Sequence, residues 1–384
     1  MESYDTVIVG AGLAGLQCAR LLAIEGFKVL LIDRKPSLAQ TIHTTGIFVR
    51  KTLEDFDLPD YCLGPPVRHV SLFSPAMKEL EFESAYDEFR VGRMAPLYDH
   101  YLKQCINSGV TWRAGTSYAD HSNEQQQVIV NLVCGSSTQK VATRYLIGAD
   151  GARSRVAKDL KLDLNRHWIV GVERVFANVP LDGPPRLFCF LDPELAPGYI
   201  GWVAHDGEEA HVGVGGHTER FDPLSALSKF QSRIAGIVDL SRAEQLEQRG
   251  GRIPVGGVLV NIVNRQGMLI GDAAGAVSPL TAGGLDPCMR LSNLAAKTAA
   301  AFLQSGDERV LAAYSGKRFR SRFASRILAR RVVSGLHGRF IMEVACRTLR
   351  LPILNSLARH VFFGRGSFPD VPMPTISRPA IDRN

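Results

Sequence analysis

The sequence lacks the patterns that mark several classes of protein. Its seven cysteines are odd in number and no two are spaced as C-x-x-C, which argues against a disulfide framework or a zinc site. No run of about 18 uncharged apolar residues occurs, so we expect no membrane-spanning helix. There is no G-x-S-x-G pattern and no internal repeat. The chain enters an apolar run within a few residues of its start, so we expect no cleaved signal and a reduced, cytoplasmic protein.

Acidic residues are scarce in one part of the chain. The net charge of +7 is uneven, because the window 316–365 holds twelve Lys and Arg residues against a single acid, Glu343. Apolar residues alternate with these cations, as in amphipathic helices. Such helices either lie on an anionic membrane surface, bind a partner protein, or cap the rest of the protein with their cations in solvent. No recognised nucleic-acid-binding module accompanies the charge, so we expect no nucleic acid partner.

The chain does contain a glycine-rich turn between an apolar run and a helix-forming segment. The run at 6–9 leads into Gly10-Ala11-Gly12-Leu13-Ala14-Gly15, a G-x-G-x-x-G pattern. In the dinucleotide fingerprint Gly10 permits the tight turn, Gly12 lets the backbone approach a pyrophosphate, and Gly15 lets the helix pack on the strand. The phosphates would lie at the positive end of the helix that contains Ala14.

A second apolar run, at 28–32, ends in Asp33, which stands 18 residues after Gly15. A carboxylate roughly 20 residues beyond the last glycine is where the ribose of a dinucleotide needs one. The two runs and the helix between them therefore predict a βαβ unit that binds a dinucleotide. The pattern does not distinguish FAD from NAD(P).

Rossmann-like segments recur in three separated blocks, and alternating apolar segments lie between them. Antiparallel strands are expected at 67–73, 80–82, 168–175, 187–191, 199–204 and 211–214. Helices are expected at 97–106, 222–248 and 286–303, and 36–65 is expected to be irregular. We therefore predict an α/β protein with an α+β insert. It comprises a discontinuous nucleotide-binding domain (1–66, 90–166 and 252–310), an inserted antiparallel-sheet substrate domain (67–89 and 167–251), and a basic C-terminal helical region (311–384).

Two later strand ends carry aspartates. Asp150 follows an apolar run and precedes Gly151, and Asp272 stands in Gly271-Asp272-Ala273-Ala274-Gly275, ahead of a turn with Gly283 and Gly284. Together with the first glycine-rich turn, these motifs resemble those of the p-hydroxybenzoate-hydroxylase-fold flavoproteins over about residues 5–310. The resemblance implies that FAD is bound by a Rossmann-like domain of the glutathione-reductase type.

The resemblance also implies a role for each motif residue. Gly10, Gly12 and Gly15 would hold the pyrophosphate, and Asp33, with Arg34 beside it, would bind the adenosine ribose. Arg93 would lie against the FAD, Asp150 is the D-G aspartate, and Asp272 would bind near the ribityl chain and pyrophosphate. The helix after Gly283-Gly284 would point its N–H groups at the flavin edge that becomes negative on reduction. From the residues alone, Asp150 can also be a strand-end turn residue and Arg93 a surface cation.

Within this fold the sequence is most similar to the geranylgeranyl reductase family. The similarity lies in Pro197-Gly198-Tyr199-Ile200-Gly201-Trp202 and in Val212-Gly213-Val214-Gly215. The family's Y-x-W-x-F-P pattern has one extra residue here, and His43-Thr44-Thr45-Gly46 stands where those reductases often carry Cys-Gly. Tyr199 and Trp202 would either line the substrate or pack within the sheet. The W-x-W-x-I-P pattern of flavin-dependent halogenases is absent.

These features predict an FAD-dependent oxidoreductase that acts on a small apolar or aromatic substrate. NAD(P)H, as a transient reductant, or another donor would reduce the flavin, which would then support either hydride transfer or monooxygenation. His43 is the best candidate proton donor because its loop should border the flavin ring; His205 and His211 are weaker candidates. No metal site is predicted.

One alternative is a flavoprotein that modifies or binds a partner protein, as a maturation factor does. The basic window 316–365 would then be the binding surface. If that window met a membrane instead, the protein would be a peripheral membrane protein.

Overall fold

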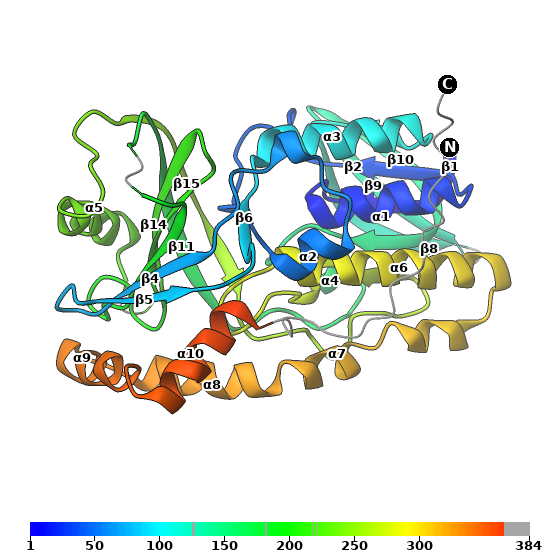
Figure 1. Ribbon diagram of the computed structural model, residues 1–384. Helices are drawn as coiled ribbons and strands as arrows, with labels where there is room; N and C mark the ends of the chain where they lie inside the picture. Colours follow the sequence, from blue (N-terminus) through cyan, green and yellow to red (C-terminus); the bar gives the residue numbers. More distant parts are fainter. Residues whose placement is uncertain (125–126, 181–182, 218, 220, 365–384) are drawn as a thin grey trace, which may run out of the picture.

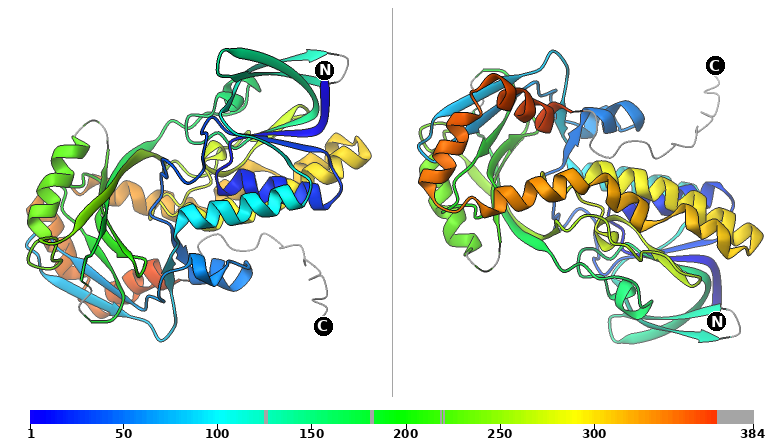
Figure 2. Two further views of the ribbon diagram at one scale, coloured as in Figure 1. Left: turned by 90° about the horizontal axis from the view of Figure 1, so that it is seen from above. Right: turned by 90° about the horizontal axis from the view of Figure 1, so that it is seen from below.

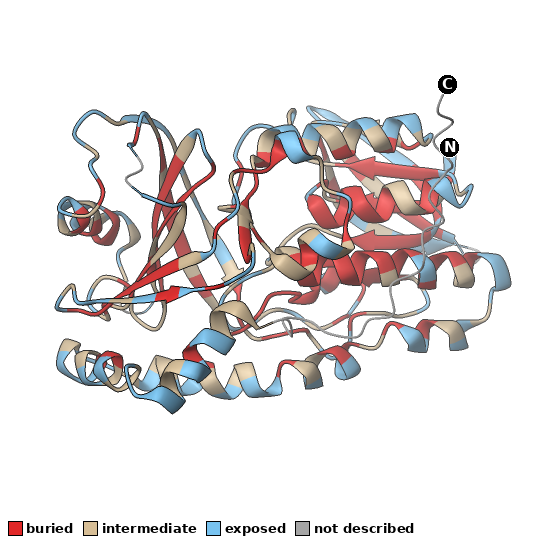
Figure 3. Ribbon diagram, in the orientation of Figure 1, coloured by how far each residue is buried: buried red, intermediate tan, exposed pale blue. Residues whose placement is uncertain are grey.

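The computed structural model describes residues 1–124, 127–180, 183–217, 219 and 221–364. Its strands form two large sheets that lie side by side, and a string of C-terminal helices runs along one side of both (Figure 1 and Figure 2). The larger core lies between the first sheet and the helices that cover it, where the buried residues gather (Figure 3).

The first sheet is the predicted nucleotide-binding sheet. Its strand order is β7 (Thr111–Arg113), β2 (Val29–Ile32), β1 (Glu2–Val9), β10 (Ser137–Gly148), β9 (Gln127–Cys134) and β8 (Thr116–Glu124), and β16 (Gly267–Leu269) also pairs with β10. β7, β2, β1, β10 and β16 are parallel, whereas β9 and β8 run antiparallel to their neighbours. β2 is buried along its whole length, as expected of a parallel strand covered on both faces.

Three helices cover one face of this sheet. α1 (Leu13–Ile24) contacts both α3 (Met94–Asn107) and α6 (Leu285–Ser305) (Figure 1). The short α4 (Arg155–Asp159) lies against β8 and β10. The small residues of α1 and α6, among them Ala19 and Ala295, are fully buried, which lets the two helices approach closely.

The second sheet is the predicted inserted sheet. Its order is β15 (Glu244–Pro254), β11 (Trp168–Ala177), β14 (Glu209–Gly216), β13 (Gly201–His205), β12 (Arg186–Phe190), β4 (His69–Phe73) and β5 (Glu79–Glu83). The prediction of an antiparallel sheet is wrong for one pair, because β4 and β12 run parallel; all the other neighbours are antiparallel. α5 (Pro223–Ile234) covers one face through a core that contains Val212, Val214 and Phe230. Because side chains alternate along β14, His211, Gly213 and Gly215 point to the opposite face, towards the first sheet's loops.

Most of the predicted elements are confirmed, and two further predictions are wrong in part. The predicted helix at 222–248 ends at Ile234, and Glu244 begins β15. The stretch 244–254 is rich in Glu and Gln, which favour helices. It nevertheless forms a strand, because it pairs along the whole of β11 and these strand–strand hydrogen bonds outweigh the local preference.

The second error concerns residues 36–65, which are not irregular throughout. They contain β3 (Ile47–Val49), α2 (Arg50–Asp55) and the 3-10 turn η1 (Asp60–Cys62). β3 pairs with β6 (Phe89–Val91), a partner about 40 residues away in the chain, so local pattern could not reveal it. The domain limits drawn from the sequence stay a prediction.

The C-terminal region is helical, as predicted. Its elements are η4 (Glu308–Ala313), α7 (Gly316–Arg322), α8 (Ala324–Gly335), α9 (Arg339–Thr348) and α10 (Pro352–Phe363), and residues 365–384 of the predicted region lie outside the described residues. Phe362 of α10 packs on Phe82 of β5 with ring centroids 5.6 Å apart. No helix among the described residues is long and apolar enough to cross a membrane.

Candidate active site

Four strands of the first sheet bring the predicted motifs to one edge. Val9 at the end of β1 is level with Ile32 of β2 and Gly148 of β10, and Gly148 is level with Leu269 of β16. Because these strands are parallel, the residues that follow them lie along the same edge of the sheet. Those residues are Gly10, Asp33, Asp150 and Asp272. Open α/β sheets bind their ligands at this carboxyl edge.

The glycine turn has the geometry of a phosphate cradle. Gly10 has a φ of +104°, and a Cβ there would lie 2.3 Å from the Ala149 carbonyl oxygen. A Cβ on Gly15 would lie 1.9 Å from the Gly10 carbonyl oxygen, so Gly15 is what lets α1 approach the turn. Gly12, the N-cap of α1, would meet no atom within 4 Å and supplies no side-chain cap. The space beside Gly12 at the start of α1 is therefore open, as the approach of a pyrophosphate to this turn requires.

Asp33 lies beside this turn. One of its carboxylate oxygens accepts the Ala11 N–H at 2.8 Å, and the other accepts the Lys35 N–H at 2.9 Å. These contacts hold the carboxylate next to the glycine turn, where the ribose beyond the pyrophosphate is expected. Arg34 is exposed.

Asp272 lies between the first turns of two helices. It belongs to the 3-10 turn η3 (Gly271–Ala274), and a Cβ on Gly271 would lie 2.9 Å from the Ala14 Cβ in α1. A Cβ on Gly284, the N-cap of α6, would lie 3.7 Å from Asp272 Oδ1. Burial raises the pKa of Asp272 to about 6. The N-termini of α1 and α6 thus converge on one partly buried carboxyl group, as the motifs predict for a shared cofactor.

Asp150 and Arg93 have additional structural partners. Asp150 Oδ2 accepts the N–H groups of Arg155 and Val156 at 2.7 and 3.1 Å, so it caps α4, which is the strand-end role left open by the sequence. Arg93 reaches the second sheet, where its guanidinium lies 2.8 Å from Glu208. Asp150 Oδ1 and Arg93 Nε are both buried without a hydrogen-bond partner. The open space at Gly12 and these two atoms fit a polar group such as FAD.

The loop that carries His43 lies against the second sheet. Thr45 Oγ1 donates to Glu173 of β11 at 2.6 Å, and Arg249 of β15 donates to the Thr44 carbonyl oxygen at 3.4 Å. His43 itself is exposed and lies beside Gly251 of β15. Partial desolvation lowers its pKa, and the charge of Lys35 lowers it further.

Tyr199 and Trp202 lie over glycines of β14. A Cβ on Gly215 would lie 2.7 Å from the Tyr199 ring, and one on Gly213 would lie 2.2 Å from the Trp202 ring. The Tyr199 hydroxyl donates to the Thr281 carbonyl oxygen at 2.7 Å, which joins the second sheet to the turn ahead of α6. The two rings meet edge to face, with centroids 6.3 Å apart and planes inclined at 67°. Glycines at 213 and 215 therefore leave the room that both rings occupy on this face.

A buried ion-pair network beside Trp202 was not recognised in the sequence. His211 of β14 is 2% exposed, with Nδ1 3.7 Å from Glu173 Oε1 and Nε2 3.8 Å from Asp206 Oδ2. Arg249 lies 3.6 Å from the same Glu173 oxygen. Burial lowers the pKa of His211, but Asp206 and Glu173 outweigh that effect and raise it to about 9. The sequence feature that could have predicted this network is a histidine and a glutamate at inward positions of the paired strands β14 and β11.

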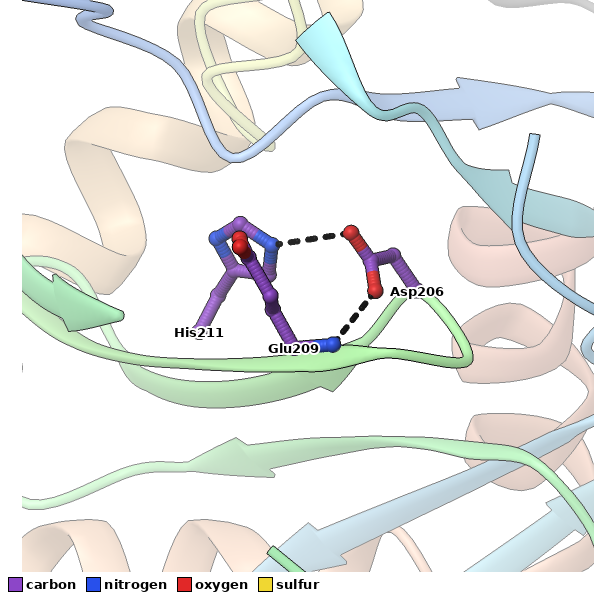
Figure 4. Close-up of side chains that lie close together, drawn as sticks. All are labelled: Asp206, Glu209 and His211. Carbon is purple, nitrogen blue, oxygen red and sulfur yellow. Dashed lines mark hydrogen bonds and ion pairs between the residues drawn. The ribbon is translucent and has the colours of Figure 1, made fainter. Parts of the chain in front are cut away.

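Asp206, Glu209 and His211 could together hold a metal ion, because one ligand atom of each lies within 4.8 Å of the others (Figure 4). The Asp206 carboxylate, however, already accepts the N–H groups of Glu208 and Glu209 at 2.8 and 2.6 Å. A histidine held as an imidazolium has no lone pair for a metal. We interpret the group as an ion-pair network, and the predicted absence of a metal site stays a prediction.

Asp272→Asn tests the convergence of the two helices on one cofactor. The amide keeps the shape of the side chain but removes the charge, so we expect FAD affinity to fall about tenfold, the size of one charged hydrogen bond. Titration of the cofactor-free protein with FAD measures the change. Asp239→Asn, at an exposed aspartate of the second domain, is the matched control. Equal FAD affinities of the two variants would show that Asp272 does not contribute to FAD binding.

Comparisons with known proteins agree with this geometry. The chain matches the FAD binding domain family over residues 3–330. Geranylgeranyl diphosphate reductase from Rhodobacter capsulatus is 29% identical over 314 residues, which cover 79% of this chain and 76% of that protein. Digeranylgeranylglycerophospholipid reductase from Methanocaldococcus jannaschii is 26% identical over 316 residues, which cover 80% of this chain and 79% of that protein.

Among solved structures, a geranylgeranyl bacteriochlorophyll reductase-like protein from Thermoplasma acidophilum has the same fold. It matches with a TM-score of 0.84 at 20% identity and covers 95% of this chain and 96% of that chain. The family match spans both sheets and α6, which begins at Leu285. The protein therefore belongs to the FAD binding domain family and is an FAD-dependent oxidoreductase of the p-hydroxybenzoate-hydroxylase fold.

Proposed function

We propose that this protein reduces carbon–carbon double bonds in the prenyl chain of a lipid or lipid precursor. Two relatives that match about four fifths of the chain are named for the reduction of geranylgeranyl groups. The structural observation that supports the proposal is the pair of aromatic rings, Tyr199 and Trp202, on the sheet face next to the turn before α6. Aromatic side chains suit contact with an apolar, unsaturated chain.

The residues of the chain would bind, orient and protonate. Gly12 and the N-terminus of α1 would hold the pyrophosphate, and Asp33 would hold the adenosine ribose. FAD, when bound, would supply hydride transfer, and the N–H groups at the start of α6 would lie where they stabilise negative charge on the flavin. Reduction of one double bond adds a hydride to one carbon and a proton to the other. The electron pair comes from NAD(P)H, which becomes NAD(P)⁺, or from another two-electron donor.

The test is an anaerobic assay with geranylgeranyl diphosphate as the probe and NADPH, NADH or dithionite as alternative donors. We expect products that have gained two hydrogen atoms per reduced bond, detected by mass spectrometry. A variant that cannot bind FAD is the control. A parallel assay in air tests the alternative. If the anaerobic assay gives no reduced products and the assay in air consumes oxygen in step with the substrate, the protein is a monooxygenase and the proposal is wrong.

The protonation of His43 gives a pH dependence. A proton donor must be protonated, and the pKa of His43 lies below its ordinary value of 6.5. We therefore expect kcat to decrease as the pH rises through a value below 6.5, and His43→Gln to remove this dependence. His337→Gln, at an exposed histidine between α8 and α9, is the control. An unchanged pH profile in His43→Gln would exclude His43 as the donor.

A further inference from the structure

The inner side of the C-terminal helices is bound to both sheets. Arg320 of α7 donates to the carbonyl oxygens of Gly256 and Val258 at 2.9 and 3.1 Å. Arg330 of α8 donates to Pro279 O at 3.1 Å and to Gly198 O at 3.3 Å, and it lies over the Tyr199 ring. These cations are therefore structural, and they place α8 on the two loops that carry Tyr199 and the turn before α6.

The outer side of the same helices is apolar. Of the seventeen large apolar side chains exposed among the described residues, eight lie within residues 328–357, where Figure 3 shows the outward stretches of α8 and α10 as exposed. Phe340 is 80% exposed and Ile353 is 83% exposed. We call this set the outer apolar face; it consists of Leu328, Val332, Phe340, Ile341, Val344, Leu351, Ile353 and Leu357.

This spacing belongs to amphipathic helices whose second apolar side has no partner within the described chain. On α8, the outward Leu328 and Val332 are four residues apart, and the buried Arg330 lies on the other side. On α9, Phe340, Ile341 and Val344 are exposed while Met342 and Cys346 are buried. A monomer gains nothing from exposing so many apolar groups on neighbouring helices, so a binding surface is the better explanation.

Exposed cations accompany the outer apolar face, and acids do not. The exposed cations are Lys317, Arg318, Arg331, Arg347, Arg350 and Arg359. Arg350 and Arg359 also donate to the carbonyl oxygens of Glu79 and Glu83 in β5, at 2.7 and 2.6 Å. Glu343, the single acid of the window 316–365, accepts the Ala76 N–H at 3.1 Å and lies 3.5 Å from Arg347. The surface thus combines apolar side chains with a net positive charge, which is complementary to a bilayer that contains anionic lipids.

We propose that the outer apolar face of α8–α10 docks on the surface of an anionic lipid bilayer. The apolar side chains enter the region between headgroups and acyl chains, and the cations contact the headgroups. Docking in this orientation places α8 between the bilayer and the loops of the active site. The proposal rests on exposure and charge and does not require the proposed reductase activity, because binding is measured without turnover.

Vesicle flotation of the FAD-loaded protein tests the proposal. We expect binding to vesicles of phosphatidylcholine with phosphatidylglycerol, and weaker binding to phosphatidylcholine alone. Phe340→Ser with Ile353→Ser should lower partitioning at least about tenfold, because both side chains are almost fully exposed. Ile24→Ser with Leu246→Ser, at exposed apolar residues of the first and second domains, is the matched control and should bind as the wild type does.

A second variant separates charge from apolar contact. Lys317→Gln, Arg318→Gln and Arg331→Gln together should weaken binding to the phosphatidylglycerol vesicles about tenfold or more and leave binding to neutral vesicles unchanged. Unaltered flavin absorbance and melting temperature would show that each variant is folded. The proposal is overturned if the wild type does not float with phosphatidylglycerol vesicles. It is also overturned if the Phe340/Ile353 variant floats equally well, or if light scattering shows that this face is covered by a second copy of the chain or a co-purified protein.

Discussion

Gly12→Ala is expected to lower FAD affinity by about a hundredfold or more and to leave the fold of the cofactor-free protein unchanged. A Cβ at Gly12 would meet no protein atom within 4 Å, and the residue has a φ of −68°, which alanine adopts readily. The new methyl group would instead occupy the space through which a pyrophosphate approaches the backbone. A hundredfold loss corresponds to about 2.7 kcal/mol of binding free energy. Fluorescence titration with FAD measures it.

Gly15→Ala is the comparison, because it should lower the stability of the cofactor-free protein as well as FAD affinity. Its Cβ would lie 1.9 Å from the Gly10 carbonyl oxygen, so α1 must move away from the turn. We expect FAD affinity to fall and the cofactor-free protein to lose about 1–3 kcal/mol of unfolding free energy. Gly236→Ala, where nothing lies within 4 Å of the added Cβ, controls for glycine replacement as such. If Gly12→Ala binds FAD as tightly as Gly236→Ala does, the pyrophosphate does not lie on this turn.

His211→Gln is expected to cost about 3–5 kcal/mol of unfolding free energy near pH 6, because it leaves the buried carboxylates of Glu173 and Asp206 facing one another without the imidazolium. Chemical denaturation measures the difference from the wild type. Lys103→Ala, which breaks the exposed ion pair with Asp99, is the control and should change stability by no more than about 1 kcal/mol.

The pH dependence of this difference identifies its origin. The pKa of His211 is raised from 6.5 to about 9, so its stabilising contribution is fully present below pH 6.5 and is lost as the pH rises through about 9. The pKa values of Glu173 and Asp206 are lowered, chiefly because His211 outweighs their burial, so their contribution is lost as the pH falls below about 4. The difference between wild type and His211→Gln should therefore be largest between about pH 4.5 and 6.5 and shrink towards pH 9.

A double-mutant cycle separates the pair from the packing around it. Glu173→Gln together with His211→Gln should cost less than the sum of the two single changes, because no unmatched charge then remains on that side of the ring. Strict additivity would show that His211 contributes by packing alone. A pH-independent difference would show that the histidine is not an imidazolium in the folded protein.

The cofactor site could be predicted from the sequence because its residues are fixed by local backbone requirements. Only glycine readily tolerates the φ of +104° at Gly10 and the close backbone approach at Gly15. The two glycines therefore identify this turn in the sequence. Asp33 and Asp272 follow apolar strands directly, and parallel strands bring their carboxyl ends to one edge whatever the intervening chain does. Pairings over long separations could not be read in this way. The local sequence of β3 does not indicate that it pairs with β6. In the same way, the Glu- and Gln-rich sequence of β15 does not indicate that it pairs with β11.

The sequence by itself determined the βαβ turn, its acids, most strands of the inserted sheet and the basic helical end. Each of these depends on backbone conformation, side-chain period or charge within a short segment. The parallel pairing of β4 with β12 was not determined in this way. The tertiary structure alone decided which charged groups meet. Glu173, Asp206, His211 and Arg249 come from three strands and a turn. Burial opposes the charged forms, but the interactions within this group outweigh it, so the pKa values of Glu173 and Asp206 are lowered and that of His211 is raised. It also decided which arginines of the C-terminal helices are bound to carbonyl oxygens and which apolar side chains face outwards, since both depend on the surface against which the helices pack.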